Sequence, residues 1–283
     1  MSRLLHVAVA RYEVGVIDGF DAFAAKFVRW VSEAVDAGAE LLLFPEYFAM
    51  ELAGTGGRLD QQVDLMQLHY EDFRALVARQ ARLHRVTICA GSYPVRDADG
   101  QVRNRSLIAF ADGRIEHQDK LTMTRFESEE WHIAPGRGLR VFDIGKAKLG
   151  IAICYDSEFP AIAARLAEAG AELLLVPSCT DTLAGHHRVR IGCQARALEN
   201  QCYVLQSSTS GSIEGSPSID INIGAAGIYS PPDRGFSDDG LVALGALDHG
   251  RWLYAVLDFE RIAAVRSDGQ VLNFADRGRA RLD

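Results

Sequence analysis

Two hydrophobic periods run along the chain, and they predict its secondary structure. Residues 4–10, LLHVAVA, are a short apolar run typical of a buried strand, whereas residues 21–38 repeat apolar positions every three to four residues and close at Gly38, as an amphipathic helix does. Further strands are predicted at 40–44, 86–92, 106–111, 141–144, 149–154, 172–177, 202–208, 225–231, 241–247 and 252–258, and further helices at 61–84, 158–170 and 187–201. Residues 119–138 have no clear period and are expected to form a loop.

One short phrase occurs twice. AGAELLL stands at 37–43 and again at 169–175, each time between a predicted helix and a predicted strand, and a further helix and strand follow each copy. This arrangement is typical of two related halves that place helices outside and stack their sheets inside. A common helix-to-strand junction without wider meaning fits the letters equally well. The copies end differently, in Pro45-Glu46 and Pro177-Ser178, so only the first supplies a carboxylate.

Composition narrows the class of protein. Hydrophobic residues make up 48% of the 283 residues, which is enough for a sizeable core, and no Pro- or Ser-rich linker divides the chain, so residues 1–283 are expected to form a single domain. The net charge of −8 disfavours nucleic acid or an anionic membrane surface as a partner. The N-terminus does not resemble a signal peptide, and no apolar stretch approaches the length of a membrane span.

The five cysteines form no CxxC pair and are odd in number, which favours free thiols in a reducing, cytoplasmic setting. No HExxH motif or spaced Cys/His cluster indicates a metal site. Cys154 is distinctive because it ends the apolar run of 149–154 just before a predicted helix, where a helix N-terminus favours the thiolate. An inert core thiol is the alternative for Cys154, and it is the interpretation for Cys89, Cys179, Cys193 and Cys202.

A nucleophilic thiol needs a base and a group that holds the developing oxyanion. None of the histidines is a convincing partner, and no GxSxG motif offers a serine nucleophile instead. A carboxylate base is therefore considered, and Glu46 stands at a strand end in the related half.

Three blocks of the sequence resemble the signature blocks of a known family. LLLFPEYF around Glu46, DKLTMTRFE around Lys120 and GIAICYDSEFP around Cys154 look like the signature blocks of the nitrilase superfamily, the carbon–nitrogen hydrolases. The segments EEWHIAPG, ELLLVPS, QARALENQCYV and AAGIYSP follow in the order of that family, so the resemblance extends from residue 4 to about residue 260.

The resemblance implies an α/β fold, a four-layer αββα sandwich with two pseudo-symmetric halves, and a cofactor-independent hydrolase that is a homodimer or a larger homo-oligomer. It implies that Cys154 attacks an amide carbonyl, that Glu46 is the general base, and that Lys120 and the backbone N–H of Tyr155 stabilise the oxyanion. Glu129 matches a second family glutamate, whose implied role is to hold Lys120 or to share a proton with the site. Taken singly, Lys120 fits an exposed hairpin charge, and Glu46 and Glu129 fit solvated loop carboxylates.

The sequence departs from many relatives near the nucleophile. Glu158 stands where they carry an arginine that can grip a carboxylate, so we expect a neutral or amine-bearing linear amide or carbamoyl compound as the small-molecule substrate. Residues Tyr47, Trp131, Glu158 and Thr180 are candidates for the pocket wall, although each also fits a core or surface position. Acyl transfer to an amine, or a catalytically silent scaffold, remain alternatives to hydrolysis. The polar segment after about residue 260 is expected to contact a neighbouring subunit.

Overall fold

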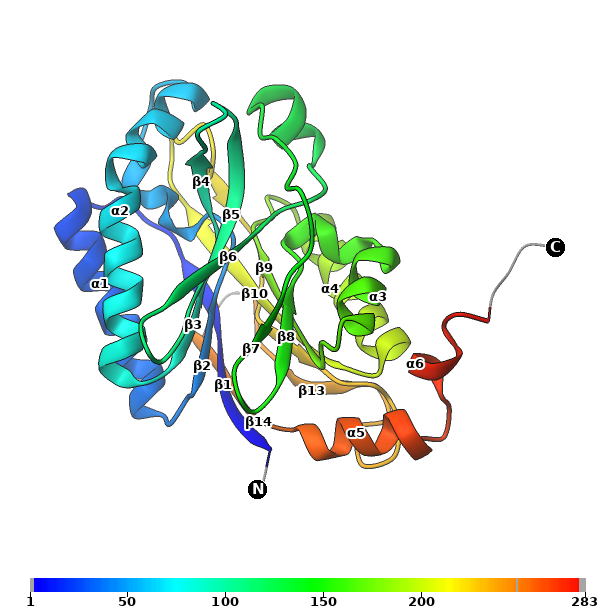
Figure 1. Ribbon diagram of the computed structural model, residues 1–283. Helices are drawn as coiled ribbons and strands as arrows, with labels where there is room; N and C mark the ends of the chain where they lie inside the picture. The colour runs from blue at the N-terminus through cyan, green and yellow to red at the C-terminus, as the bar shows by residue number, and fades with distance from the viewer. Residues whose placement is uncertain (1–2, 248, 280–283) are drawn as a thin grey trace.

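The protein forms four layers, with helices on the two outer sides and β-strands between them. A computed structural model describes residues 3–247 and 249–279. Helices α1 and α2 cover one side of the strands, and α3 and α4 cover the other (Figure 1). The helices are α1 Gly19–Asp36, α2 Leu59–His84, α3 Pro160–Glu168, α4 Leu183–Asn200, α5 Phe259–Asp268 and α6 Asn273–Asp276, with short helical turns η1 Phe48–Ala53, η2 Phe126–Glu130 and η3 Cys154–Glu158. This architecture is the predicted αββα sandwich.

The strands form one curled sheet that folds into two facing parts. The first part consists of β1 Leu4–Glu13, β2 Leu41–Phe44, β3 Thr87–Ala90, β4 Tyr93–Arg96, β5 Val102–Ala109, β6 Ile115–Asp119 and β14 Trp252–Asp258. The second consists of β7 Val141–Asp143, β8 Lys148–Ile151, β9 Leu173–Ser178, β10 Tyr203–Ser212, β11 Ile221–Asn222, β12 Gly227–Tyr229 and β13 Leu241–Leu244. The end of β1 pairs in parallel with β10, Arg11 opposite Ser208, and this pairing joins the two parts.

The repeated phrase marks two halves with matching hydrogen bonds. Glu40 N–H donates to His6 O while its own carbonyl accepts from Thr87, and Glu172 does the same between Lys148 and Tyr203. The side chains of the two glutamates form ion pairs across the halves, Glu40 with Lys146 and Glu172 with Arg3. The repeat therefore reflects the architecture: β1-α1-β2-α2-β3 corresponds to β8-α3-β9-α4-β10.

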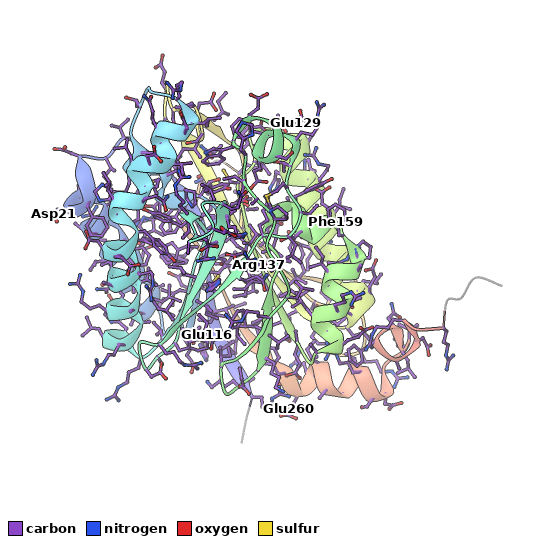
Figure 2. The ribbon with its side chains drawn as sticks, turned by 45° about the horizontal axis from the view of Figure 1, so that its top comes forward. Asp21, Glu116, Glu129, Arg137, Phe159 and Glu260 are labelled. Carbon is purple, nitrogen blue, oxygen red and sulfur yellow. The ribbon has the colours of Figure 1, made fainter. Side chains whose placement is uncertain are left out.

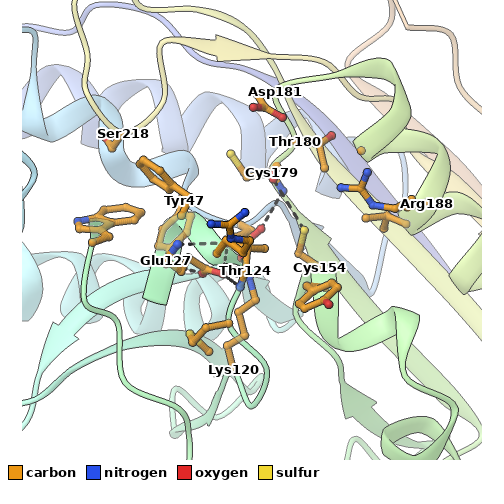
Figure 3. Close-up of a pocket in the computed structure, with 18 of the residues that line it drawn as sticks. Tyr47, Lys120, Thr124, Glu127, Cys154, Cys179, Thr180, Asp181, Arg188 and Ser218 are labelled. Atoms are coloured by element: carbon orange, nitrogen blue, oxygen red, sulfur yellow. Dashed lines mark hydrogen bonds and ion pairs between the residues drawn. The ribbon is translucent and has the colours of Figure 1, made fainter. Parts of the chain in front are cut away.

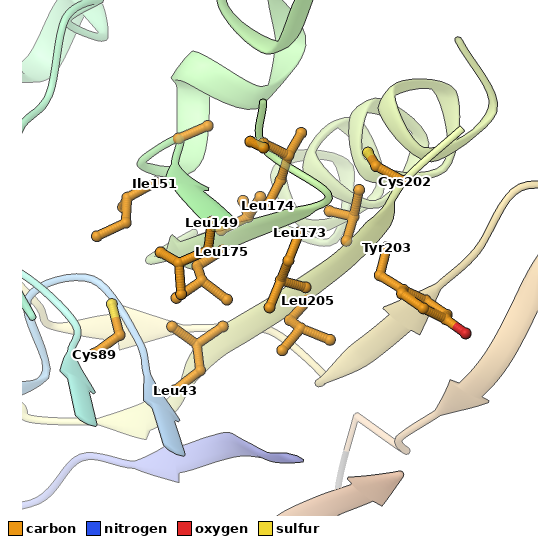
Figure 4. Packing of buried hydrophobic residues seen from close by; sticks show 14 of the residues in the cluster. Leu43, Cys89, Leu149, Ile151, Leu173, Leu174, Leu175, Cys202, Tyr203 and Leu205 are labelled. Carbon is orange, nitrogen blue, oxygen red and sulfur yellow. The ribbon is translucent and has the colours of Figure 1, made fainter. Parts of the chain in front are cut away.

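The core between the facing parts of the sheet is aliphatic. Leu43 and Cys89 of the first part lie opposite Leu149, Leu175 and Leu205 of the second (Figure 4). A second core, rich in aromatic rings, lies between the first part and helices α1 and α2. Because both faces of the parallel strands are covered, β2 and β9 are continuous apolar runs without alternation.

The expected loop at 119–138 needs correction, and the structure adds helices after residue 258 that the sequence analysis did not predict. The stretch 119–138 is not entirely loop, since it contains the turn η2. The C-terminal segment forms α5, whose Phe259, Ile262 and Val265 are buried in the core of their own chain. The expected contact of this segment with another subunit stays a prediction, now for the outward faces of α5 and α6.

Candidate active site

Glu46, Lys120 and Cys154 meet at the ends of three strands that are far apart in the sequence. Glu46 follows β2, Lys120 follows β6 and Cys154 follows β8, and their side chains line one cavity of about 780 Å³. Lys120 Nζ lies 2.9 Å from Glu46 Oε1, and both side chains are almost fully buried. Figure 3 shows Lys120 and Cys154 approaching this pocket from different segments. The three predicted residues are therefore brought together.

Left-handed backbone marks the two turns that present these groups. Cys154 has φ 49° at the start of η3, and Tyr47, directly after Glu46, has φ 57°. Side chains other than glycine rarely adopt this region, and such strain persists only where the surroundings hold it. Ser157 Oγ donates to the carbonyl of Cys154 at 2.6 Å, which fixes the turn that carries this thiol.

Glu127, and not Glu129, contacts the lysine. Lys120 Nζ lies 2.6 Å from Glu127 Oε2, whose side chain is 4% exposed. Glu129 forms a bidentate pair with Arg125, half exposed, and Figure 2 shows it at the outer rim of the molecule. Two positions along a helical turn rotate a side chain to roughly the opposite face, so only one of these glutamates can point inward. The match to Glu129 was off by two residues.

Asn104 of β5 connects the two buried carboxylates. Its Nδ2 donates to Glu46 Oε1 at 2.8 Å and to Glu127 Oε1 at 3.0 Å, and its side chain is fully buried. Lys120 N–H in turn donates to the carbonyl of Asn104 at 2.9 Å. Asn104 therefore fixes the spacing of both carboxylates and the backbone of the lysine.

The residue after the second copy of the repeated phrase donates a hydrogen bond to Glu46, which follows the first copy. Cys179, which follows Ser178, donates its backbone N–H to Glu46 Oε2 at 2.9 Å, and its carbonyl lies 3.8 Å from Cys154 Sγ as an acceptor. Its own thiol lies 3.2 Å from Asn222 Oδ1 at the pocket wall. The interpretation of Cys179 as an ordinary core thiol is therefore wrong.

Electrostatics separate the roles of the buried groups. Burial raises the pKa of Glu46, Lys120 offsets this only in part, and the charge of Glu127 adds to the rise. Burial would raise the pKa of Glu127 too, but Lys120 and the hydrogen bonds around Glu127 hold it below its usual value. Burial alone would lower the pKa of Lys120, yet the two carboxylates outweigh it and raise that pKa well above its ordinary value, so the ammonium stays charged.

The surroundings of Cys154 disfavour its thiolate form. Burial and the charge of Glu46 raise the pKa of Cys154 well above its usual value, against the opposing charge of Lys120. The expected helix N-terminus does not act on it, because α3 begins at Pro160 and η3 intervenes. Burial thus outweighs the influence of a helix N-terminus that the sequence suggested, and a thiol that attacks from this site needs a base to take its proton.

The residues predicted to line the pocket, and Tyr155, all do so, although several of their polar groups already bond to other groups of the protein. Tyr47 donates its hydroxyl to Glu127 Oε1 at 3.0 Å, and its ring lies 4.7 Å from that of Trp131. Thr180 donates its hydroxyl to Ile223 O at 2.7 Å, so this donor is not free for a substrate. Tyr155 and Glu158 border the cavity as well, and Glu158 lies 3.5 Å from Arg188.

Sequence reasoning missed three buried residues around the site, Asn104, Glu127 and Asp156, and the half-buried Cys179 at the pocket wall. Glu127 lies within the block DKLTMTRFE itself, so its proximity to Lys120 was a usable signal. Asn104 lies in a strand and carries no local sign of a site. Within residues 3–247 and 249–279, no group of three or more His, Cys, Asp or Glu residues could hold a metal ion. No helix of this described part is long and apolar enough to cross a membrane.

Fold and site together define a class of α/β protein with a buried Glu-Lys-Cys constellation, and the sequence places the chain in a family. Residues 7–239 match the carbon-nitrogen hydrolase family, and the chain belongs to it, as the three blocks predicted. A probable hydrolase, YhcX, of Bacillus subtilis (strain 168) is 33% identical over 277 residues, which are 97% of this chain and 54% of that protein. The chain thus spans about half the length of this relative.

Solved structures agree on the fold. The NitFhit protein of C. elegans has a TM-score of 0.75 and 22% identity, covering 93% of this chain and 63% of that one. A glutamate-to-glutamine mutant of an amidase from Nesterenkonia sp. AN1, described as showing Michael addition of acrylamide at its active-site cysteine, has a TM-score of 0.73 and 20% identity and covers 93% and 97%.

Proposed function

We propose that the chain hydrolyses a non-peptide C–N bond of a linear amide or carbamoyl compound through a thioester on Cys154. The observation that carries this proposal is the placement of Lys120 Nζ, 2.9 Å from Glu46 Oε1 and 2.6 Å from Glu127 Oε2, beside a buried thiol in an open cavity. The likeness to an amidase with an active-site cysteine supports the same chemistry. No step of it needs a metal or a cofactor.

The hydrogen bonds support one assignment of the proton transfers. A carboxylate offers about four lone-pair positions. Glu127 receives five donors, from Lys120, Asn104, Tyr47 and both the N–H and the hydroxyl of Thr124, and has no position left for a proton. Glu46 receives three donors: Lys120 and Asn104 on Oε1, and Cys179 N–H on Oε2. Oε2 of Glu46 is therefore the base, and Glu127 is a permanently ionised anchor for Lys120.

The reaction then follows in two halves. Glu46 Oε2 takes the thiol proton as Cys154 Sγ bonds to the carbonyl carbon, and the third N–H of Lys120, with the backbone N–H of Tyr155, holds the oxyanion. The C–N bond breaks as Glu46 returns the proton to the leaving nitrogen, which departs as ammonia or an amine. Glu46 then deprotonates a water that attacks the thioester, the C–S bond breaks, and the thiol regains the proton.

Mass spectrometry and product assays test this proposal together. Incubation with a linear amide should release ammonia and add an acyl mass to Cys154. Cys154→Ala should abolish both, and Glu46→Gln should lower turnover by about 10²–10⁴-fold. Cys179→Ala serves as the matched pocket thiol, and the adduct must persist in it. An adduct that disappears with Cys179 instead of Cys154, or a wild type that turns over nothing, would reject the mechanism, and the latter would favour the scaffold alternative.

The substrate class is tested with amides that differ only at the far end. Hexanamide, 6-aminohexanamide and adipic acid monoamide carry neutral, cationic and anionic ends on similar chains, and N-carbamoylbutylamine adds a carbamoyl group. Glu158, Asp181 and Asp220 border the cavity together with Arg125 and Arg188, which leaves an excess of acidic groups, so we expect the neutral and cationic amides to be preferred over the anionic one. Added butylamine separates hydrolysis from acyl transfer, because only transfer yields the N-butyl amide.

A homodimer or larger homo-oligomer is proposed as well. Exposed apolar side chains on α4, Ile191 and Leu198, are compatible with a subunit contact. Light scattering on the eluting protein should give at least twice the 31.0 kDa of one chain, and a value of one chain would reject the proposal.

A further inference from the structure

A buried carboxylate that does not line the pocket links the nucleophile to the lysine. Asp156 lies two residues after Cys154 in η3 and is 2% exposed. Its Oδ2 accepts the backbone N–H of Leu121 at 3.1 Å, and its Oδ1 accepts that of Thr122 at 2.7 Å. These are the two residues directly after Lys120. One side chain from the nucleophile's turn thus holds two consecutive amides beside the lysine.

The other contacts show why this link matters for geometry. The backbone of Lys120 is held by Asn104 through its N–H and by Gly136 N–H through its carbonyl, at 2.9 and 2.7 Å. Both of these residues come from segments that do not carry Cys154. On the far side of η3, Arg196 donates to the carbonyl of Ser157 at 3.1 Å and braces the turn. Asp156 therefore ties the lysine's segment to the turn that presents the thiol.

We propose that Asp156 is a positioning residue that sets the Lys120 ammonium relative to Cys154 Sγ. The inference rests on the proposed hydrolase function and deepens it. An oxyanion donor stabilises a transition state only when it lies at hydrogen-bond distance from the place where the charge develops, and a misplacement of about 1 Å costs about 10²-fold in rate. A long lysine side chain gains this accuracy only if its backbone and the nucleophile's backbone are fixed to each other.

Asp156→Asn tests the link with little change of volume. The amide group can accept one of the two N–H donors but presents its own N–H to the other. With hexanamide, or the most rapidly hydrolysed amide of the panel above, kcat should fall about 10–100-fold while KM stays within about threefold. Alkylation of Cys154 by iodoacetamide transfers the thiol proton to Glu46, forms an S–C bond, releases iodide and develops no oxyanion, so its rate should stay within about threefold of wild type.

Two comparisons complete the test. Asp239→Asn is the matched control, because Asp239 also accepts a backbone N–H, from Leu241, in an exposed turn away from the pocket, and it should change neither rate. In a Lys120→Met background, Asp156→Asn should add less than about threefold to the loss, since the two residues act through one interaction.

The outcomes separate this inference from the proposed function. An active wild type with an equally active Asp156→Asn variant would overturn the positioning role alone. So would an equal loss of hydrolysis and alkylation together with a lowered melting temperature, since that result describes a residue needed only for folding. A wild type that hydrolyses no amide of the panel would overturn the proposed function, and the inference with it.

Discussion

At the residue scale, two glutamates in one site have different tasks because their surroundings differ. Glu127 is saturated with donors and its pKa is lowered, whereas Glu46 retains an open lone pair on Oε2 and its pKa is raised. We therefore propose the less satisfied carboxylate, Glu46, as the base. Lys120 needs both, since its ammonium would be costly to bury without them.

Substitutions of Glu127 and Glu129 should show which of these two glutamates holds Lys120. Glu127→Gln removes the charge opposite Lys120 and turns an N–H toward existing donors, so we expect kcat to fall by about 10²-fold, as for loss of one oxyanion donor. Glu129→Gln makes the same chemical change two residues away, on a half-exposed side chain paired with Arg125. It should leave kcat within about twofold. Equal losses in the two variants would contradict the placement of Glu127 as the anchor.

The pH dependence should be set by Glu46 at its acid end. The base works only when ionised, and its pKa is raised, so kcat/KM should rise with pH through a value above that of an ordinary glutamate. Glu127 contributes to this rise through its charge, and Glu127→Gln should therefore move the acid limb to lower pH. The raised pKa of Lys120 predicts no loss from its deprotonation up to about pH 10. If the acid side of the kcat/KM profile lies at the same pH in Glu127→Gln as in the wild type, Glu46 does not govern it.

At the scale of elements, Glu46, Lys120 and Cys154 each follow the end of a strand. Close contacts of the backbone fix the course of the chain there. Gly91, just after β3, has φ +55° and faces the turn after β2. A Cβ at this position would lie 1.8 Å from Pro45 O and 2.9 Å from Phe48 Cδ1. The loop that carries Glu46 can take its course only because this residue has no side chain.

Gly91→Ala should therefore disturb the base as well as the fold. Gly100→Ala is its matched control, with φ +79° and nothing within 4 Å of the added Cβ, so its cost is backbone strain of about 1–2 kcal/mol. Gly91→Ala should cost about 1–3 kcal/mol more through overpacking and should lower kcat, because Pro45 must move. Denaturant unfolding and amide turnover measure the two effects. Equal behaviour of both variants would exclude the close contact as the cause.

At the scale of the whole molecule, the two halves share one core and close it with α5. Ile262 of this helix is fully buried in the aliphatic core, and Arg266 donates to the carbonyls of Gln201, Ala171 and Asn200. The C-terminal segment is thus part of the fold of its own chain. Any contact that it makes with another subunit must use its exposed residues.

Substitutions along this segment should separate the two roles. Ile262→Ala should lower the free energy of unfolding by about 2–5 kcal/mol, through lost burial and the cavity left behind. Val271→Ala, at a side chain that is 53% exposed, should change it by less than about 0.5 kcal/mol. Denaturant titration gives both values, and light scattering reports any change in subunit number. A large loss of stability for Val271→Ala, with dissociation, would place Val271 in a subunit contact.

The sequence alone was sufficient for most of the helices and strands, for the two halves, and for the selection of Glu46, Lys120 and Cys154, whereas β4, β6 and the C-terminal helices were not predicted. Hydrophobic periods, a repeated phrase and turn residues are local, and each block of the resemblance is a continuous stretch. Glu127 was two residues from the predicted position because a helical turn decides which side chain faces inward, and that turn lay in a stretch without period. Asn104, the backbone of Cys179 and Asp156 carry no sign of their roles in their own neighbourhoods.

Only the tertiary structure decided how these groups are connected. Cys179 N–H reaches Glu46 across 133 positions, and Asp156 reaches Leu121 across 35. Such contacts depend on where the ends of separate strands meet, and no local pattern records that. Burial, and with it the raised pKa of Cys154, follows from the same packing, because the cost of a charge depends on everything around it and not on the neighbours in sequence.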